Sequence, residues 1–206
     1  MVDLPPLDPG IEIVVASRGI SKGLAQTEGP QLVARGQLGL GAFYAGAQWK
    51  NISSPTADGE ASAFAGARTA AAGFDLTLSA AYKRLTASPA SADSEALETV
   101  AAVSRRIGPV TPRLSATWSP DDLGSTGRSL FVEAGAGYAL PRGLGLSAAL
   151  GRRSRDGGPD YTAWNAGFTK TLIPGVSADL RYYDTDLGRL GDPYRARVVL
   201  SFRGRF

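Results

Sequence analysis

Arginine and lysine at alternate positions are the residues of this chain whose spacing could do chemistry. The segment 194–206 shows the pattern most clearly, because one of its faces is rich in arginine. These arginines are Arg195, Arg197, Arg203 and Arg205. The other face is apolar, and the chain ends on Phe206. A guanidinium stays charged and offers a fork of donors that fits carboxylate or phosphate, so one face could bind anions while the other contacts hydrocarbon.

Alternation with a period of two is typical of a β-strand, because successive side chains leave opposite faces. The same alternation recurs along the whole chain between turn residues. The sequence therefore predicts about twelve strands, at 11–15, 32–40, 43–50, 61–70, 74–83, 97–107, 113–118, 130–138, 144–151, 164–169, 176–183 and 194–206. Ten strands are an alternative, because 61–70 and 97–107 have the weakest patterns. A helix over 87–103 is another, because alanine, leucine and glutamate favour helices.

The connections between these strands alternate in length. Short turns are expected near 39–41, 71–73, 108–112, 141–143 and 174–175, and longer loops at 21–30, 53–59, 88–94, 120–127, 155–159 and 185–193. Short periplasmic turns and longer extracellular loops are typical of outer-membrane barrels, whereas a soluble sandwich has no reason to sort its loops by length. The sequence predicts an all-β fold: one domain over 1–206, a transmembrane antiparallel up-and-down β-barrel with short periplasmic turns and moderate extracellular loops. We expect it in the outer membrane of a Gram-negative bacterium, with both termini periplasmic.

The apolar face of each strand is expected to contact lipid. Representative lipid-facing residues are Phe43, Leu78, Leu146, Leu180, Val198 and Leu200. Aromatic residues gather near strand ends, as in the girdles of such barrels. Outer-membrane lipid and lipopolysaccharide are the expected surroundings. Acidic loops could hold divalent cations that bridge lipopolysaccharide phosphates, but a merely solvated rim is the simpler interpretation.

The composition excludes several classes of function. Cysteine and histidine are both absent, so disulfides, thiolate chemistry and a Ser-His-Asp triad are excluded. We predict no enzymatic activity, no metal site and no cofactor. Nucleic-acid binding is not expected although the pI is about 9.3, because the basic residues are spread around a bore and form no patch. No signal peptide is present, and Met1 stands directly before a segment typical of a mature start, so we expect that a leader has been removed.

The predicted interior is basic and the predicted rim is acidic. By parity the inward basic residues are Arg18, Arg35, Lys50, Arg68, Lys83, Arg113, Arg153, Arg181, Arg195, Arg197, Arg203 and Arg205. The inward acids are Glu12, Asp75, Glu98, Glu133 and Asp179, whereas acids such as Glu60 and Asp122 are placed in or beside loops. A narrow pore with low-dielectric walls concentrates such a field, and rings of arginine or lysine favour anions. We therefore expect a porin that passes small anionic solutes. The alternative is a non-conducting structural or adhesion-type barrel that internal salt bridges close.

The pore-lining residues most suited to solute contact are Arg35, Arg68, Lys83, Arg113, Glu133, Arg181, Arg195 and Arg197. Arginines midway along their strands could pass an organic anion from one guanidinium to the next, and the expected constriction consists of Arg35, Arg68, Arg113, Arg181 and Arg197. Alternatively, Arg181 and Arg197 pair with Asp179 and Glu133 and only stiffen the wall.

Phe206 is the candidate assembly signal, because a terminal aromatic residue is expected to be recognised by the barrel-assembly machinery. It could instead only anchor the periplasmic girdle. The sequence leaves open whether the barrel is a monomer or a small homo-oligomer, and which solute it carries.

The N-terminal third resembles a known family. The similarity rests on the segments 17–21 (SRGIS), 27–32 (TEGPQL) and 41–46 (GAFYAG), together with Trp49 and Asn51. These segments resemble the proteobacterial TorF (Gcw_chp) family. The resemblance implies an outer-membrane, porin-like barrel with no agreed substrate.

Overall fold

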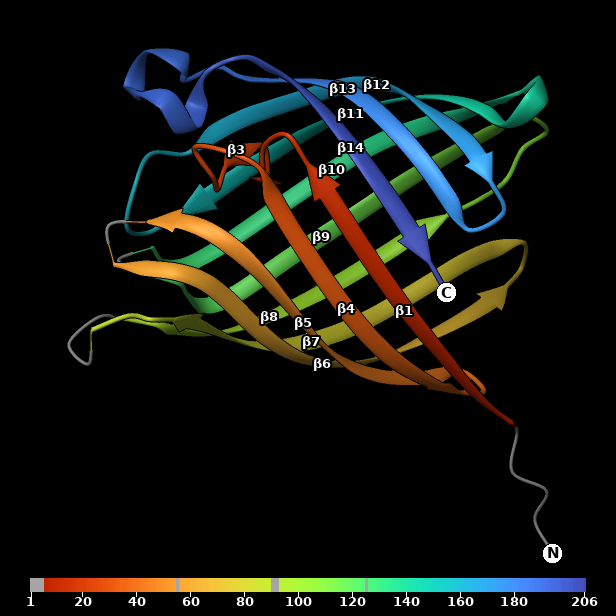
Figure 1. The fold of residues 1–206 in the computed structure, drawn as a ribbon, viewed down its shortest axis with the longest axis horizontal. Helices are drawn as coiled ribbons and strands as arrows, with labels where there is room; N and C mark the ends of the chain where they lie inside the picture. Colours follow the sequence, from red (N-terminus) through yellow and green to blue (C-terminus); the bar gives the residue numbers. More distant parts are fainter. Residues whose placement is uncertain (1–5, 55, 90–92, 125) are drawn as a thin grey trace, which may run out of the picture.

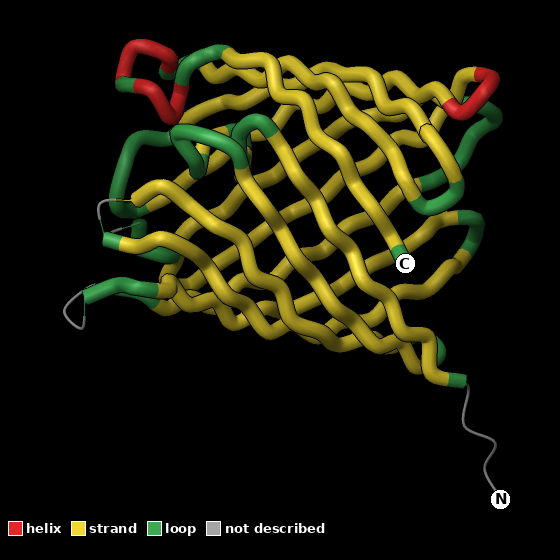
Figure 2. Tube along the Cα trace, in the orientation of Figure 1, coloured by secondary structure: helices red, strands yellow, loops and turns green. Residues whose placement is uncertain are grey.

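Twelve antiparallel strands close into a barrel in the computed structural model, which describes residues 6–54, 56–89, 93–124 and 126–206 (Figures 1 and 2). The barrel strands are β1 (Leu7–Ala16), β4 (Gln31–Leu40), β5 (Phe43–Ser54), β6 (Ala57–Ala71), β7 (Phe74–Thr86), β8 (Glu95–Ser104), β9 (Val110–Asp122), β10 (Gly127–Leu140), β11 (Leu144–Arg155), β12 (Tyr161–Ile173), β13 (Val176–Thr185) and β14 (Arg197–Arg205). Two short strands, β2 (Ile20–Ser21) and β3 (Leu24–Ala25), form a separate hairpin. Three 3₁₀ turns complete the described elements: η1 (Pro141–Gly143), η2 (Gly188–Leu190) and η3 (Asp192–Tyr194).

Each barrel strand pairs with the barrel strand that precedes it in sequence, and a seam between β1 and β14 closes the ring. At this seam Glu12 lies opposite Arg205 and Ala16 lies opposite Ser201. The prediction of an up-and-down barrel of about twelve strands is confirmed. The alternative helix over 87–103 is wrong for its second half, because β8 is a strand that pairs with both β7 and β9; residues 90–92 lie outside the described part.

The two ends of the barrel differ. β1 begins and β14 ends at one end, called here the terminal end, where tight turns such as Ala72-Gly73 and Pro174-Gly175 connect the strands (Figure 1). The opposite end, called the loop end, carries the longer segments 17–30, 156–160 and 186–196, together with the described residues 87–89, 93–94, 123–124 and 126. The expected long loop at 53–59 is wrong, because β5 continues to Ser54 and β6 already begins at Ala57.

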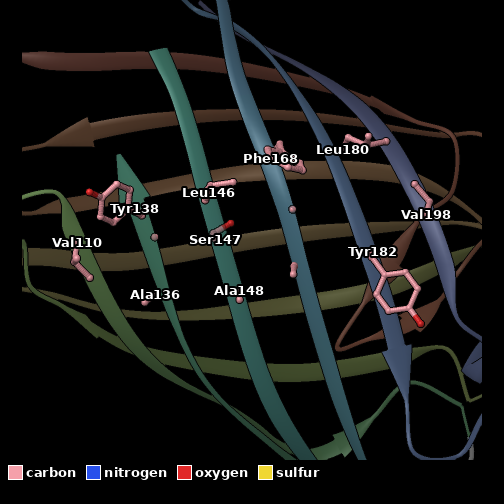
Figure 3. Close-up of a pocket in the computed structure, with 13 residues that line it drawn as sticks. Val110, Ala136, Tyr138, Leu146, Ser147, Ala148, Phe168, Leu180, Tyr182 and Val198 are labelled. Carbon is pink, nitrogen blue, oxygen red and sulfur yellow. The ribbon is translucent and has the colours of Figure 1, made fainter. Parts of the chain in front are cut away.

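Every second residue of each strand projects outward. Most of these outward residues are apolar, so the outer face is apolar along its length. All six residues predicted to face lipid are exposed on this surface, and Phe43 is the most exposed of them at 67%. Figure 3 shows one part of the outer wall, where Leu146, Phe168, Leu180 and Val198 lie on four consecutive strands near the small side chains of Ala136 and Ala148. Outward aromatic residues lie toward both ends, with Trp49 and Trp118 near the loop end and Phe43 and Tyr138 near the terminal end.

Within the described residues, no helix has the length and apolar character needed to cross a membrane.

Candidate functional site: the barrel interior

A hairpin extends across the interior of the barrel at the loop end. Residues 20–25, called here the mouth hairpin, comprise β2, β3 and the turn Lys22-Gly23 (Figure 1). Both turn residues have positive φ, 50° at Lys22 and 82° at Gly23, as type I′ turns require. The tight turn places the Lys22 side chain at the tip of the hairpin.

Lys22 joins the hairpin to the far side of the barrel. Its Nζ lies 2.6 Å from Glu98 Oε2 on β8 and 2.8 Å from Asp122 Oδ2 at the end of β9. The hydroxyl of Tyr161 on β12 donates a hydrogen bond of 2.7 Å to the Lys22 carbonyl. Because the hairpin leaves the wall between β1 and β4, these contacts carry it across the lumen.

Gly23 fits where a side chain would not. A Cβ at this position would lie 2.3 Å from the Cβ of Ala163 on β12, and its φ is in the left-handed region. Both restrictions select glycine, because only glycine adopts this φ without strain and leaves room for the wall. The tip is therefore in van der Waals contact with β12.

An ion-pair network extends from Lys22 along the wall. Lys83 Nζ on β7 lies 2.7 Å from Glu98 Oε2, and Arg153 Nη2 on β11 lies 2.8 Å from Asp122 Oδ2. Asp122 also accepts a 2.9 Å hydrogen bond from Ser129. Each carboxylate thus serves two cations, and the network links β7, β8, β9 and β11 through the hairpin tip.

The base of the hairpin is attached to the near wall. Lys50 on β5 donates to Gln26 Oε1 at 2.8 Å and lies 3.1 Å from Glu60 Oε2 on β6. The Gly19 amide donates to the buried Thr27 hydroxyl at 2.7 Å. The hairpin is consequently held at both its base and its tip.

A cavity of about 410 Å³ lies directly behind the hairpin tip. Lys22, Arg113, Glu133, Arg181 and Tyr183 contribute to its lining. Arg113 and Glu133 form no ion pair with any residue in the described part of the chain. They are therefore the charged groups of this cavity that remain available to a solute.

Arg181 is fixed by its neighbours. It donates hydrogen bonds to Asn165 Oδ1 at 2.8 Å, to Ser147 Oγ at 2.7 Å and to Asp179 Oδ2 at 2.9 Å. The expected pairing of Arg181 with Asp179 is present. This arginine braces β11, β12 and β13 from inside the barrel.

The other predicted constriction residues lie at different depths. Arg35 faces inward with its guanidinium carbon 4.1 Å from the centre of the Phe64 ring. Arg68 is nearer the terminal end, where its Nη2 lies 3.6 Å from Asp8 Oδ2. Arg197 begins β14 at the loop end and pairs with Asp192 rather than with Glu133, with 3.6 Å between Nη1 and Oδ2. The expectation that all five arginines lie midway along their strands is therefore wrong for Arg68 and Arg197.

Three further placements differ from expectation. Arg195 is exposed and follows η3, because the last strand begins only at Arg197, two residues later. Glu60 and Asp122 belong to strands and are buried inside the barrel, not on the rim, because β6 and β9 extend beyond their alternating patterns. Sequence reasoning also missed Lys22 as an interior residue.

The interior near the terminal end is paired across the seam. Glu12 Oε2 lies 2.7 Å from Arg205 Nε and 3.8 Å from Arg203 Nε. Phe206 exchanges two backbone hydrogen bonds of 2.9 Å with Ile11, while its ring is exposed. The last residue thus continues the seam through its backbone and leaves its ring free.

Solved structures of porins share this architecture. The structure described as KdgM porin matches with a TM-score of 0.67 at 6% identity, covering 96% of this chain and 99% of that one. The NanC porin matches with a TM-score of 0.60 at 8% identity, over 94% and 97% of the two chains. The COG4313 outer membrane channel from Pseudomonas putida F1 matches with a TM-score of 0.55 at 15% identity, over 97% and 95%. At these identities the likeness concerns the fold alone.

No curated protein matches the chain significantly. The family described as "Bacterial protein of unknown function (Gcw_chp)" matches residues 11–197, which is most of the sequence and includes the mouth hairpin and the cavity behind it. This chain belongs to the Gcw_chp family.

Proposed function

We propose that the protein is an outer-membrane channel for small solutes that prefers anions. A closed barrel satisfies every backbone group between its strands, which is a condition for crossing lipid. Its apolar outer face and charged inner face suit a barrel that has lipid outside and water inside. The porin architecture of its structural neighbours supports the same function. Both termini would then lie in the periplasm, and the loop end would face outward.

The preference for anions follows from which interior charges are already paired. Glu12, Glu60, Glu98, Asp122 and Asp179 each have a basic partner within 4.0 Å. Basic groups remain in excess on the inner face, because Glu98, Asp122 and Glu12 are each shared by two basic side chains. In the cavity Arg113 and Glu133 both lack an ion pair among the described residues, so the observation that carries the proposal is the basic excess of the whole inner face, to which the unpaired Arg113 belongs. Unpaired guanidinium groups in a narrow, low-dielectric passage favour anions over cations.

Reversal potentials in planar bilayers test the proposal. The purified protein should conduct weakly and select anions across a salt gradient. Arg113→Gln should lower this anion preference, whereas Arg84→Gln should leave it unchanged, because Arg84 is exposed on the outward side of β7 and pairs with Glu95. A cation preference in the unmodified protein would contradict the electrostatic argument.

One observation favours the second candidate, a non-conducting barrel. The mouth hairpin and its ion pairs cross the lumen at the loop end and narrow the route of a solute there. Complete absence of conductance in a correctly folded protein, with and without the hairpin, would favour that candidate.

A further inference from the structure

The mouth hairpin touches strands on widely separated parts of the wall. In the ring, β1 and β4 are neighbours, whereas β8 and β9 lie on the opposite side. Lys22 at the tip bonds to residues of both β8 and β9, and Gly23 contacts β12. The mouth hairpin starts on one side of the barrel wall and is bonded to the opposite side, so it divides the lumen.

Burial shows that the hairpin tip is packed closely against the far wall. The side chains of Lys22, Glu98 and Asp122 are only 12%, 10% and 7% exposed, although all three are charged and lie inside a barrel. At the terminal end, by contrast, the inward side chain of Arg205 is 65% exposed. Side chains therefore fill the lumen around these tip contacts, whereas the rim at the terminal end is open to solvent.

In the described part of the chain, the hairpin is attached to the barrel through side chains and not through strand pairing. β2 and β3 pair with each other, Ile20 opposite Ala25 and Ser21 opposite Leu24, and within the described residues neither pairs with a barrel strand. The tip is held mainly through one flexible lysine side chain and the Tyr161 hydrogen bond. Moving the tip breaks these contacts and leaves every strand ladder of the barrel intact.

We infer that the mouth hairpin is the element that limits passage through this barrel and that Lys22 is the residue that fixes it in place. The inference rests on the proposed channel function. Lys22 acts as a bridge: its ammonium group neutralises Glu98 and Asp122, which face the lumen, and ties them to the hairpin. A solute passes the loop end when this bridge opens.

Substituting each partner of the bridge separately distinguishes a bridge from a simple positive charge. If Lys22 restricts the pore by bridging, Lys22→Met and Glu98→Gln both raise single-channel conductance, because each removes one half of the same contact. If Lys22 acts only as a positive charge, these two substitutions shift ion selectivity in opposite directions and leave conductance unchanged.

The decisive variant lacks the hairpin. The Gln26 amide donates to the Gly19 carbonyl at 2.8 Å, the geometry that a two-residue turn closes. Replacing residues 20–25 with the dipeptide Asn-Gly therefore removes the hairpin tip without opening the chain. Lys170→Met is the matched control, because Lys170 is at the terminal end and donates to the Arg142 carbonyl.

Single-channel recordings in planar bilayers test the role of the hairpin. They are made on protein whose heat-modifiable migration shows that it is folded. We expect a several-fold larger conductance for the Asn-Gly variant, a smaller gain for Lys22→Met, and no change for Lys170→Met. Equal conductance of the Asn-Gly variant and the unmodified protein overturns the role of the hairpin and leaves the channel in place. A folded Asn-Gly variant that does not conduct overturns both the hairpin inference and the proposed channel function.

Discussion

Gly23→Ala should release the mouth hairpin from the wall. An alanine at φ 82° carries the cost of the left-handed region, roughly 1–2 kcal/mol for an L-residue. Its Cβ would also lie 2.3 Å from that of Ala163, and relieving this overlap costs about 1–3 kcal/mol more. In an undocked state whose turn has opened, neither cost applies, so the docked state should lose at least about 2 kcal/mol relative to it.

Limited trypsin digestion measures this loss directly. Trypsin cleaves after lysine, and Lys22 is shielded by its carboxylate partners while the hairpin is docked. Cleavage through a rapidly opening state follows the population of that state, so a loss of at least about 2 kcal/mol should raise the rate at Lys22 at least about thirtyfold. Mass spectrometry of the fragments distinguishes this site from others.

Two controls separate the contributions. Adding Ala163→Gly to Gly23→Ala removes the overlap and leaves the backbone strain, so the rate should fall but stay roughly 5- to 30-fold above that of the unmodified protein. Gly108→Ala, at a φ of 59° with open space around it, should not change cleavage at Lys22 because Gly108 lies at the terminal end. Equal cleavage of Gly23→Ala and the unmodified protein would refute the docked hairpin.

Three other substitutions test the wall, the assembly signal and the tip. Leu200→Arg on the outer face should lower the free energy of unfolding in lipid by about 2–4 kcal/mol if Leu200 lies near the bilayer midplane. Leu190→Arg in η2 is the control and should change this free energy by no more than about 0.5 kcal/mol. Urea titrations measure both free energies, and equal values would argue against lipid contact at Leu200. Phe206→Ala keeps the backbone of the seam and should lower the yield of heat-modifiable protein in the outer membrane; an unchanged yield would mean that the ring has no part in assembly. Tyr161→Phe removes the donor to the Lys22 carbonyl and should raise tryptic cleavage at Lys22 about fivefold, the equivalent of about 1 kcal/mol; an unchanged rate would show that this bond does not hold the tip.

The strands could be predicted because their evidence is local. Alternation along β14 or β7 depends only on neighbouring residues, and the apolar face must turn to lipid wherever the strand ends up. The direction of Leu78 and Leu200 was therefore predictable without knowledge of the partner strands. The start of the last strand was not predictable. The alternation of residues 194–206 includes Arg195, but the 3₁₀ turn η3 at Asp192–Tyr194 places Arg195 before the strand.

The interior contacts depend on distant parts of the chain. Asp122 is 100 residues and Tyr161 is 139 residues from Lys22 in the sequence. The dipeptide Lys22-Gly23 is a turn signal, but nothing nearby indicates that the turn enters the lumen. Glu60 and Asp122 lie in stretches without alternation, which is why their burial could not be predicted.

The seam between β1 and β14 has a consequence for how the barrel is made. Its ladder has five residue pairs, whereas the ladder between β1 and β4 has ten. Every other neighbouring pair of barrel strands can form as a local hairpin, but the seam joins the two extremities of the polypeptide, so it carries the largest loop-closure entropy and the fewest bonds to offset it. We expect an open, curved sheet to precede ring closure during biogenesis, so that this short ladder forms last. The same ladder should separate first when the protein unfolds.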